Sequence, residues 1–157
     1  MLEALQDFTS TLPPVLQWLA VVLAGAIPFV ESYFGSVLGV LAGINPVVAV
    51  AAAVAGNIAS MAVLVLGADS VRGKLVRGAR EESPRRQKLR RAFDRYGVAG
   101  VSLLGQTILP SQVTSAAMVS FGASRNAVLV WQAISIVLWG VAFGVLATLG
   151  VDLLAGR

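Results

Sequence analysis

Apolar residues run in long uninterrupted stretches along this chain, and polar residues gather at the few places where the stretches break. Three windows of more than 25 residues contain no Asp, Glu, Lys or Arg: 36 residues at 33–68, 29 residues at 96–124 and 26 residues at 126–151. A stretch of about 18 apolar residues is long enough to cross a bilayer as a helix. The pattern therefore predicts an all-α integral membrane protein.

The breaks divide the chain into two halves that have the same order of parts. Each half has a short apolar segment that reaches a proline, a second short segment that ends at a polar break, and a long segment. These segments are 12–27, 29–43 and 47–67 in the first half, and 97–109, 111–124 and 127–149 in the second. The long segments match a bilayer core of about 30 Å at about 1.5 Å per residue, whereas the short ones do not cross it alone.

Two arrangements account for each pair of short segments. The pair can form a re-entrant hairpin that enters the bilayer, turns near the midplane at Pro28 or Pro110, and leaves on the same side. Alternatively, the proline only kinks one longer helix. Periodicity alone leaves both open, and the expected topology favours the hairpin.

That topology follows from the basic segment between the halves. Residues 68–95 hold 10 of the 12 Lys and Arg residues and four acids, which gives a net charge of +6. No aromatic stacking platform is interleaved, so we expect no nucleic acid as a partner. The positive-inside rule places the segment in the cytoplasm. The first hairpin then opens outward and the second inward, which is the inverted-repeat plan of many secondary transporters.

We therefore expect a single membrane domain, 1–157, that crosses the cell inner (plasma) membrane several times. The first repeat is 12–67, the basic loop is 68–95 with its part 70–95 in the cytoplasm, and the second repeat is 96–151. Each repeat combines a proline-broken re-entrant helical hairpin with one full transmembrane helix.

Composition removes several classes of function. The chain has no Cys and no His, which excludes thiolate metal sites, disulfides, and Ser-His or Cys-His catalysis. The sequence contains no Walker A, GxSxG or HExxH motif, each of which would indicate a particular chemistry. We expect no enzymatic activity, no metal and no cofactor.

Glu31 is the leading functional candidate, because it is the only acidic or basic residue between Asp7 and Asp69. A charge at bilayer depth costs at least about 2.5 kcal/mol, so the surroundings decide whether this carboxyl is protonated. It is a candidate for proton coupling or cation binding. The alternatives are an interfacial Glu that reaches the lipid headgroups, and a structural pairing with Asn57 or Gln106.

A second polar group surrounds Pro110, with six polar side chains in an otherwise apolar half that need hydrogen-bond partners. They either line a path that faces Glu31 or satisfy backbone groups that the proline leaves free. Asn57 is interpreted first as a hydrogen-bonding contact between helices. The group consists of Gln106, Thr107, Ser111, Gln112, Thr114 and Ser115. The predicted substrate- or proton-binding residues are Glu31, Pro28, Asn57, Gln106, Thr107, Pro110, Ser111 and Gln112.

Glycines recur at four-residue spacing, and this spacing lets helices approach closely. Gly140 and Gly144 form one such pair, and Gly35, Gly39 and Gly43 form a longer series. The close approach is either within one chain or between two copies. The expected partners are therefore membrane lipids, a small lipophilic substrate, and a second copy or a larger membrane complex.

Several short motifs resemble the small multidrug export protein family, over nearly the whole chain from 25 to 150. They are Gly25-Ala26-Ile27-Pro28, Gly43-Ile44-Asn45-Pro46, Gly56-Asn57, and Phe93-Asp94-Arg95-Tyr96-Gly97 followed by Pro110. Many members carry Glu-Leu-Arg before the Ala-Ile-Pro, whereas here the acid follows it as Glu31.

The second half also looks like the wider DedA group, whose opposed re-entrant hairpins resemble this plan and some of whose members move lipids. The group's Arg-x-x-Pro-x-x-Arg motif falls on Thr107, Pro110 and Val113, so both arginines are missing. Their absence counts against a phosphate-bearing substrate, because a buried phosphate needs such partners.

Taken together, Glu31 and the resemblance imply a small secondary transporter, coupled to protons, that exports a small or lipophilic cationic compound. One alternative is a DedA-type flippase or scramblase for a lipid or lipid carrier. The other is a membrane scaffold or accessory subunit that transports nothing.

Overall fold

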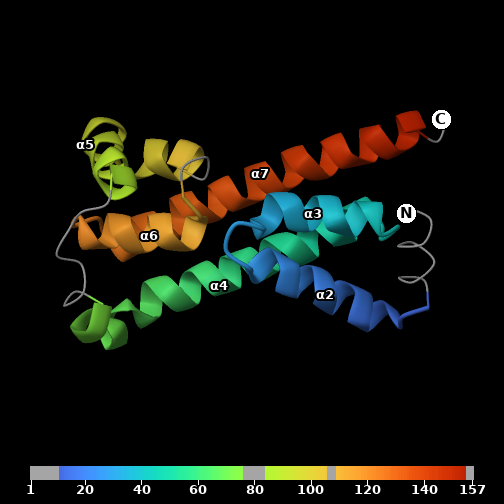
Figure 1. The fold of residues 1–157 in the computed structure, drawn as a ribbon, viewed down its shortest axis with the longest axis horizontal. Helices are drawn as coiled ribbons and strands as arrows, with labels where there is room; N and C mark the ends of the chain where they lie inside the picture. The colour runs from blue at the N-terminus through green and yellow to red at the C-terminus, as the bar shows by residue number, and fades with distance from the viewer. Residues whose placement is uncertain (1–10, 76–83, 106–108, 155–157) are drawn as a thin grey trace. The chain divides into compact units, whose positions relative to one another are not determined.

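The computed structural model describes residues 11–75, 84–105 and 109–154, and this part of the chain forms six helices and no strand (Figure 1). The all-helical prediction is confirmed for these residues. The helices are α2 (Pro14–Ala26), α3 (Glu31–Leu41), α4 (Pro46–Leu75), α5 (Pro84–Gly105), α6 (Ser111–Ser120) and α7 (Arg125–Leu154).

The two long helices, α4 and α7, have 30 residues each. Within them, Pro46–Gly67 and Arg125–Leu153 are long and apolar enough to cross a membrane, with a mean hydropathy of 2.2 in each. A helix of this length extends about 45 Å at about 1.5 Å per residue. Asn45 caps the start of α4, because its Oδ1 accepts a hydrogen bond from the Val47 backbone N–H at 3.0 Å.

The first short pair is a hairpin and not a kinked helix. Helix α2 ends at Ala26, and α3 begins at Glu31 after a turn that contains Pro28. A Cβ atom placed on Gly35 would lie 3.3 Å from Gly25, and one placed on Gly39 would lie 3.3 Å from Val21. Contacts that move backward along α2 as they move forward along α3 require antiparallel helices, which excludes the kink for residues 14–41.

The second short pair, α5 and α6, also packs together. Helix α5 contains a break at Gly97, which has φ 65° and ψ −167°, a backbone conformation that glycine adopts without strain. Part of the predicted basic loop is in fact helical: α4 continues to Leu75, and α5 begins at Pro84. The physical reason is local, because Arg, Lys, Gln and Leu are strong helix formers and proline suits the first helical position.

The chain divides into two compact units. Unit 1 comprises Met1–Ala59 and Ile136–Arg157, and unit 2 comprises Ser60–Ser135. Unit 1 therefore contains α2, α3, the first half of α4 and the end of α7, whereas unit 2 contains α5, α6, the rest of α4 and the start of α7. Each unit combines one hairpin with part of both long helices.

Small residues allow the helices of unit 1 to pack closely. A Cβ atom on Gly140 would lie 2.8 Å from Val54 of α4 and 3.2 Å from Ser32 of α3, and one on Gly144 would contact Val50. The spacing of glycines in α7 therefore serves packing within this unit, where α3 runs parallel to α7 and α4 runs antiparallel to it.

The second helix of each hairpin ends in the same way. The Ile44 N–H donates to the Gly39 carbonyl at 3.1 Å, and the Ala123 N–H donates to the Met118 carbonyl at 3.0 Å. In each case the preceding residue is a glycine with positive φ, 81° at Gly43 and 105° at Gly122. Both ends are thus Schellman caps, which require the left-handed backbone that glycine adopts readily.

Candidate functional site

Glu31 is the first residue of α3 and is completely buried, with 0% of its surface exposed. The backbone around it is strained, because Phe29 has φ 73° and Glu31 has φ 54°. Left-handed backbone in non-glycine residues costs about 1–3 kcal/mol each and concentrates at functional sites. Phe29 is 64% exposed, so the turn carries its ring outward while the carboxylate is enclosed. Complete burial argues against an interfacial Glu31.

The acid site consists of Glu31 and the buried polar residues Ser32, Ser36 and Asn57, all in unit 1. The Ser32 hydroxyl donates to the Ile136 carbonyl of α7 at 2.8 Å, and the Ser36 hydroxyl donates to the Ser32 carbonyl at 2.6 Å. A Cβ atom placed on Gly140 of α7 would be close to both Val54 of α4 and Ser32 of α3. Asn57 lies one turn of α4 beyond Val54. Ser32, the residue after Glu31, therefore lies where α3, α4 and α7 come together.

Two opposing effects act on the Glu31 carboxylate. Burial penalises the ionised form by roughly several kcal/mol, whereas an acid in the first turn of a helix gains about 0.3–1 kcal/mol when it is ionised. Besides Glu31, the described residues of unit 1 contain two titratable side chains, Tyr33 and Asp152. Asp152 lies 16 residues beyond Ile136, about 24 Å along α7 at about 1.5 Å per residue.

The neutral site is a second buried polar group, and it lies in unit 2. Gln112 Nε2 donates to the Ser60 hydroxyl of α4 at 2.9 Å, and the Ser135 hydroxyl of α7 donates to the Ser102 carbonyl of α5 at 2.7 Å. No member carries a charge. The buried side chains are Ser102, Ser111, Gln112, Thr114, Ser115, Gln132 and Ser135.

The two sites repeat one local arrangement. Ser32 and Gln112 are each the second residue of their helix, α3 and α6. Ser32 bonds to α7, the long helix of the second half, and Gln112 bonds to α4, the long helix of the first half. Each hairpin is therefore attached to the long helix of the other half, and the main chemical difference is the acid in unit 1.

The structure places the predicted residues as follows. Glu31 and Asn57 are buried in unit 1, and Pro28 lies exposed in the turn before α3. Pro110 is the buried N-cap of α6, where Ser111 and Gln112 follow it. Gln106 and Thr107 lie outside the described residues.

Sequence reasoning missed several buried polar residues because each is a lone polar residue in an apolar stretch. Gln132 and Ser135 share one face of α7 at a spacing of three residues, and that spacing was a usable signal. Ser32 and Ser36 likewise share one face of α3 at a spacing of four residues, whereas Ser102 carried no such signal. The missed residues are Ser32, Ser36, Ser102, Gln132 and Ser135.

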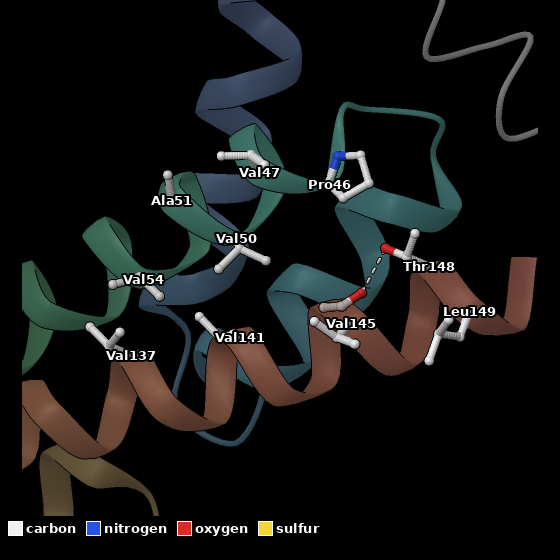
Figure 2. A pocket seen from close by; sticks show the side chains of 11 residues that line it. Pro46, Val47, Val50, Ala51, Val54, Val137, Val141, Val145, Thr148 and Leu149 are labelled. Atoms are coloured by element: carbon white, nitrogen blue, oxygen red, sulfur yellow. Dashed lines mark hydrogen bonds between the residues drawn. The ribbon is translucent and has the colours of Figure 1, made fainter.

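An apolar groove of about 520 Å³ lies between α4 and α7 within unit 1 (Figure 2). Its side chains are almost all aliphatic. The Thr148 hydroxyl donates to the Gly144 carbonyl at 2.8 Å, as the dashed line in Figure 2 shows, so this donor is used within α7. The groove therefore suits an apolar group. Its lining consists of Pro46, Val47, Val50, Ala51, Val54, Val137, Val141, Gly144, Val145, Thr148 and Leu149.

The part of the chain that the structure describes contains no group of three or more acidic residues that could hold a metal ion. The chemistry within it thus rests on one buried carboxylate, neutral hydroxyl and amide groups, and an apolar groove. Comparison with models of protein families, with curated proteins and with solved structures finds no match for this chain.

Proposed function

We propose that this protein is a small secondary transporter with inverted repeats, coupled to protons, that exports a small or lipophilic cationic compound. The observation that carries the proposal is Glu31, a fully buried carboxylate at the start of the short helix α3. The backbone is left-handed at Phe29 and at Glu31, on both sides of the N-cap residue Val30. The resemblance to small multidrug export proteins points to the same class of function.

The helix lengths support a membrane location with two re-entrant hairpins. Helices of 13, 11 and 10 residues, α2, α3 and α6, extend only about 15–20 Å at about 1.5 Å per residue. They are too short for a bilayer core of about 30 Å, whereas α4 and α7 are long enough. Broken helices at membrane depth are typical of substrate sites in transporters. The matching Schellman caps, and the matching positions of Ser32 and Gln112, support the inverted repeat.

The proposed mechanism is exchange at one carboxylate. The enclosed, ionised Glu31 is stabilised by a bound cation, and the protonated form is neutral and needs none. A proton and a cationic substrate therefore compete for the same group. If only the loaded forms reorient across the membrane, export of the cation is coupled to proton entry. The apolar groove in the same unit accommodates the apolar part of a lipophilic compound.

The test uses purified protein in proteoliposomes, with tetraphenylphosphonium as the transported cation and an imposed pH gradient. We expect Glu31→Gln to insert and fold normally, because an amide resembles the protonated acid, and to lose transport driven by the gradient. Glu31→Asp is the matched control, and we expect it to keep pH-dependent transport with a displaced midpoint. Normal transport by Glu31→Gln with unchanged pH dependence would show that this residue does not couple protons.

A further inference from the structure

The first part of α5, residues 84–96, is a strongly basic amphipathic helix. It contains six Lys and Arg residues and one acid, Asp94, which gives a net charge of +5. The proposed transport mechanism makes no use of these charges. They differ in what they contact, and the difference separates the helix into an inner and an outer face.

The inner face is attached to the end of α6, within unit 2. Leu89 is fully buried, and the ring of Phe93 lies 5.7 Å from the ring of Phe121. The guanidinium groups of Arg86 and Arg90 lie 5.5 and 5.3 Å from the centre of the Phe121 ring. Such cation–π contacts and the negative end of the α6 dipole both favour cations at this place. Two of the six charges thus fix the helix against α6.

The outer face carries the other four cations, Arg85, Lys88, Arg91 and Arg95, all exposed. At about 100° per residue they fall within an arc of about 120°, and the centre of that arc is about 140° from Phe93. Asp94 lies outside this arc. The helix therefore presents an exposed basic stripe, here called the cationic stripe, and its orientation is fixed by the inner contacts.

Gly97 marks a sharp change in the character of the chain. Its backbone, with φ 65° and ψ −167°, interrupts α5, and residues 98–105 contain no charged side chain. Tyr96, just before the break, is 54% exposed, with the Arg95 guanidinium 5.2 Å from its ring centre. Where a chain passes from the headgroup layer into hydrocarbon, the expected order is a basic stripe, a tyrosine and then an apolar segment.

We propose that the cationic stripe binds the phosphate groups of anionic phospholipids at the cytoplasmic surface. The proposal rests on the membrane location given above but not on transport. Anionic lipid is the favoured partner because the stripe lies immediately before an apolar segment, and the exposed aromatic ring beside it, Tyr96, is already in contact with the Arg95 guanidinium. Each basic residue near an anionic leaflet contributes about fivefold in affinity, the factor that corresponds to about 1 kcal/mol.

The experiment titrates the full-length protein in a nonionic detergent with phosphatidylglycerol or with phosphatidylcholine, and counts bound lipids by native mass spectrometry. We expect selective binding of phosphatidylglycerol. Replacement of Arg85, Lys88, Arg91 and Arg95 by glutamine should weaken it by two to three orders of magnitude, at about fivefold per charge. Asp94→Asn should strengthen it. As a control, lysine at the three arginine positions should retain selectivity.

Several results would overturn the proposal. Equal binding of the two lipids by the unchanged protein would do so. Unchanged phosphatidylglycerol affinity in both the Asp94→Asn variant and the glutamine variant would also do so. If the glutamine variant does not fold, Asp94→Asn and single glutamine replacements give the decisive affinities. Competition by inorganic phosphate beyond its effect on ionic strength would indicate a site for free phosphate. Glu31→Gln should leave lipid binding unchanged, so failure of the transport proposal is seen separately.

Discussion

Replacement of Gly56 by alanine tests a close approach of α4 to α2 in unit 1. A Cβ atom at this position of α4 would contact the carbonyl oxygen of Val22 in α2 and lie 2.8 Å from the carbonyl carbon and 3.1 Å from the Cα atom. These are backbone atoms, so no side-chain rotation relieves the contact. Gly67 lies 11 residues further along the same helix, and a Cβ atom there would meet nothing within 4 Å.

The two alanine variants share one energy term and differ in another. Both gain about 0.8–1 kcal/mol of helix propensity relative to glycine. Only Gly56→Ala adds overpacking, which costs about 1–3 kcal/mol in a packed interior. We therefore expect Gly67→Ala to stabilise the protein by up to about 1 kcal/mol, and Gly56→Ala to be less stable than Gly67→Ala by about 1–3 kcal/mol.

The assay is unfolding of purified protein in detergent, by heat or by added sodium dodecyl sulfate, followed through the fluorescence of the three tryptophans. Both variants should first be shown to insert into the membrane at similar levels. Equal stability of Gly56→Ala and Gly67→Ala would refute the reasoning, because it would mean that α2 does not approach α4 at Val22 as the structure describes.

Three further predictions concern strain, burial and topology. Phe29→Gly should be more stable than Phe29→Ala by about 1 kcal/mol in the same unfolding assay, because only glycine adopts φ 73° freely; equal stability would argue against a left-handed turn. Neither amide atom of buried Gln132 has a hydrogen-bond partner among the described residues, so Gln132→Met should stabilise the protein by about 1–3 kcal/mol, and destabilisation would show that the amide is bonded. Single cysteines at Ser83 and Leu2, in a chain without native cysteine, should react with an impermeant maleimide from opposite sides of the membrane, and reaction of both from one side would contradict the inverted repeat.

The sequence by itself determined the apolar helices and the breaks between them, but not the helical parts of the basic segment. Long windows without charge predict helices, and Pro28, Asn45 and Pro110 lie at or beside helix ends in the structure. Glu31 was also found from sequence, because a single acid in an apolar window carries a large desolvation cost wherever that window is buried. These properties are local: backbone restriction at proline, capping by a side chain, and the cost of a charge act within a few residues along the chain.

Only the tertiary structure decided which elements pack together. The choice between a hairpin and a kinked helix depended on the contact of Gly25 with Gly35, and the division into units depended on contacts such as Ser32 with Ile136. The burial of Ser102 was not visible in the sequence, because a lone polar residue in an apolar stretch can face lipid, a headgroup or another helix. Its surroundings come from segments distant in sequence, and the free energy of packing those segments is not encoded in any single window.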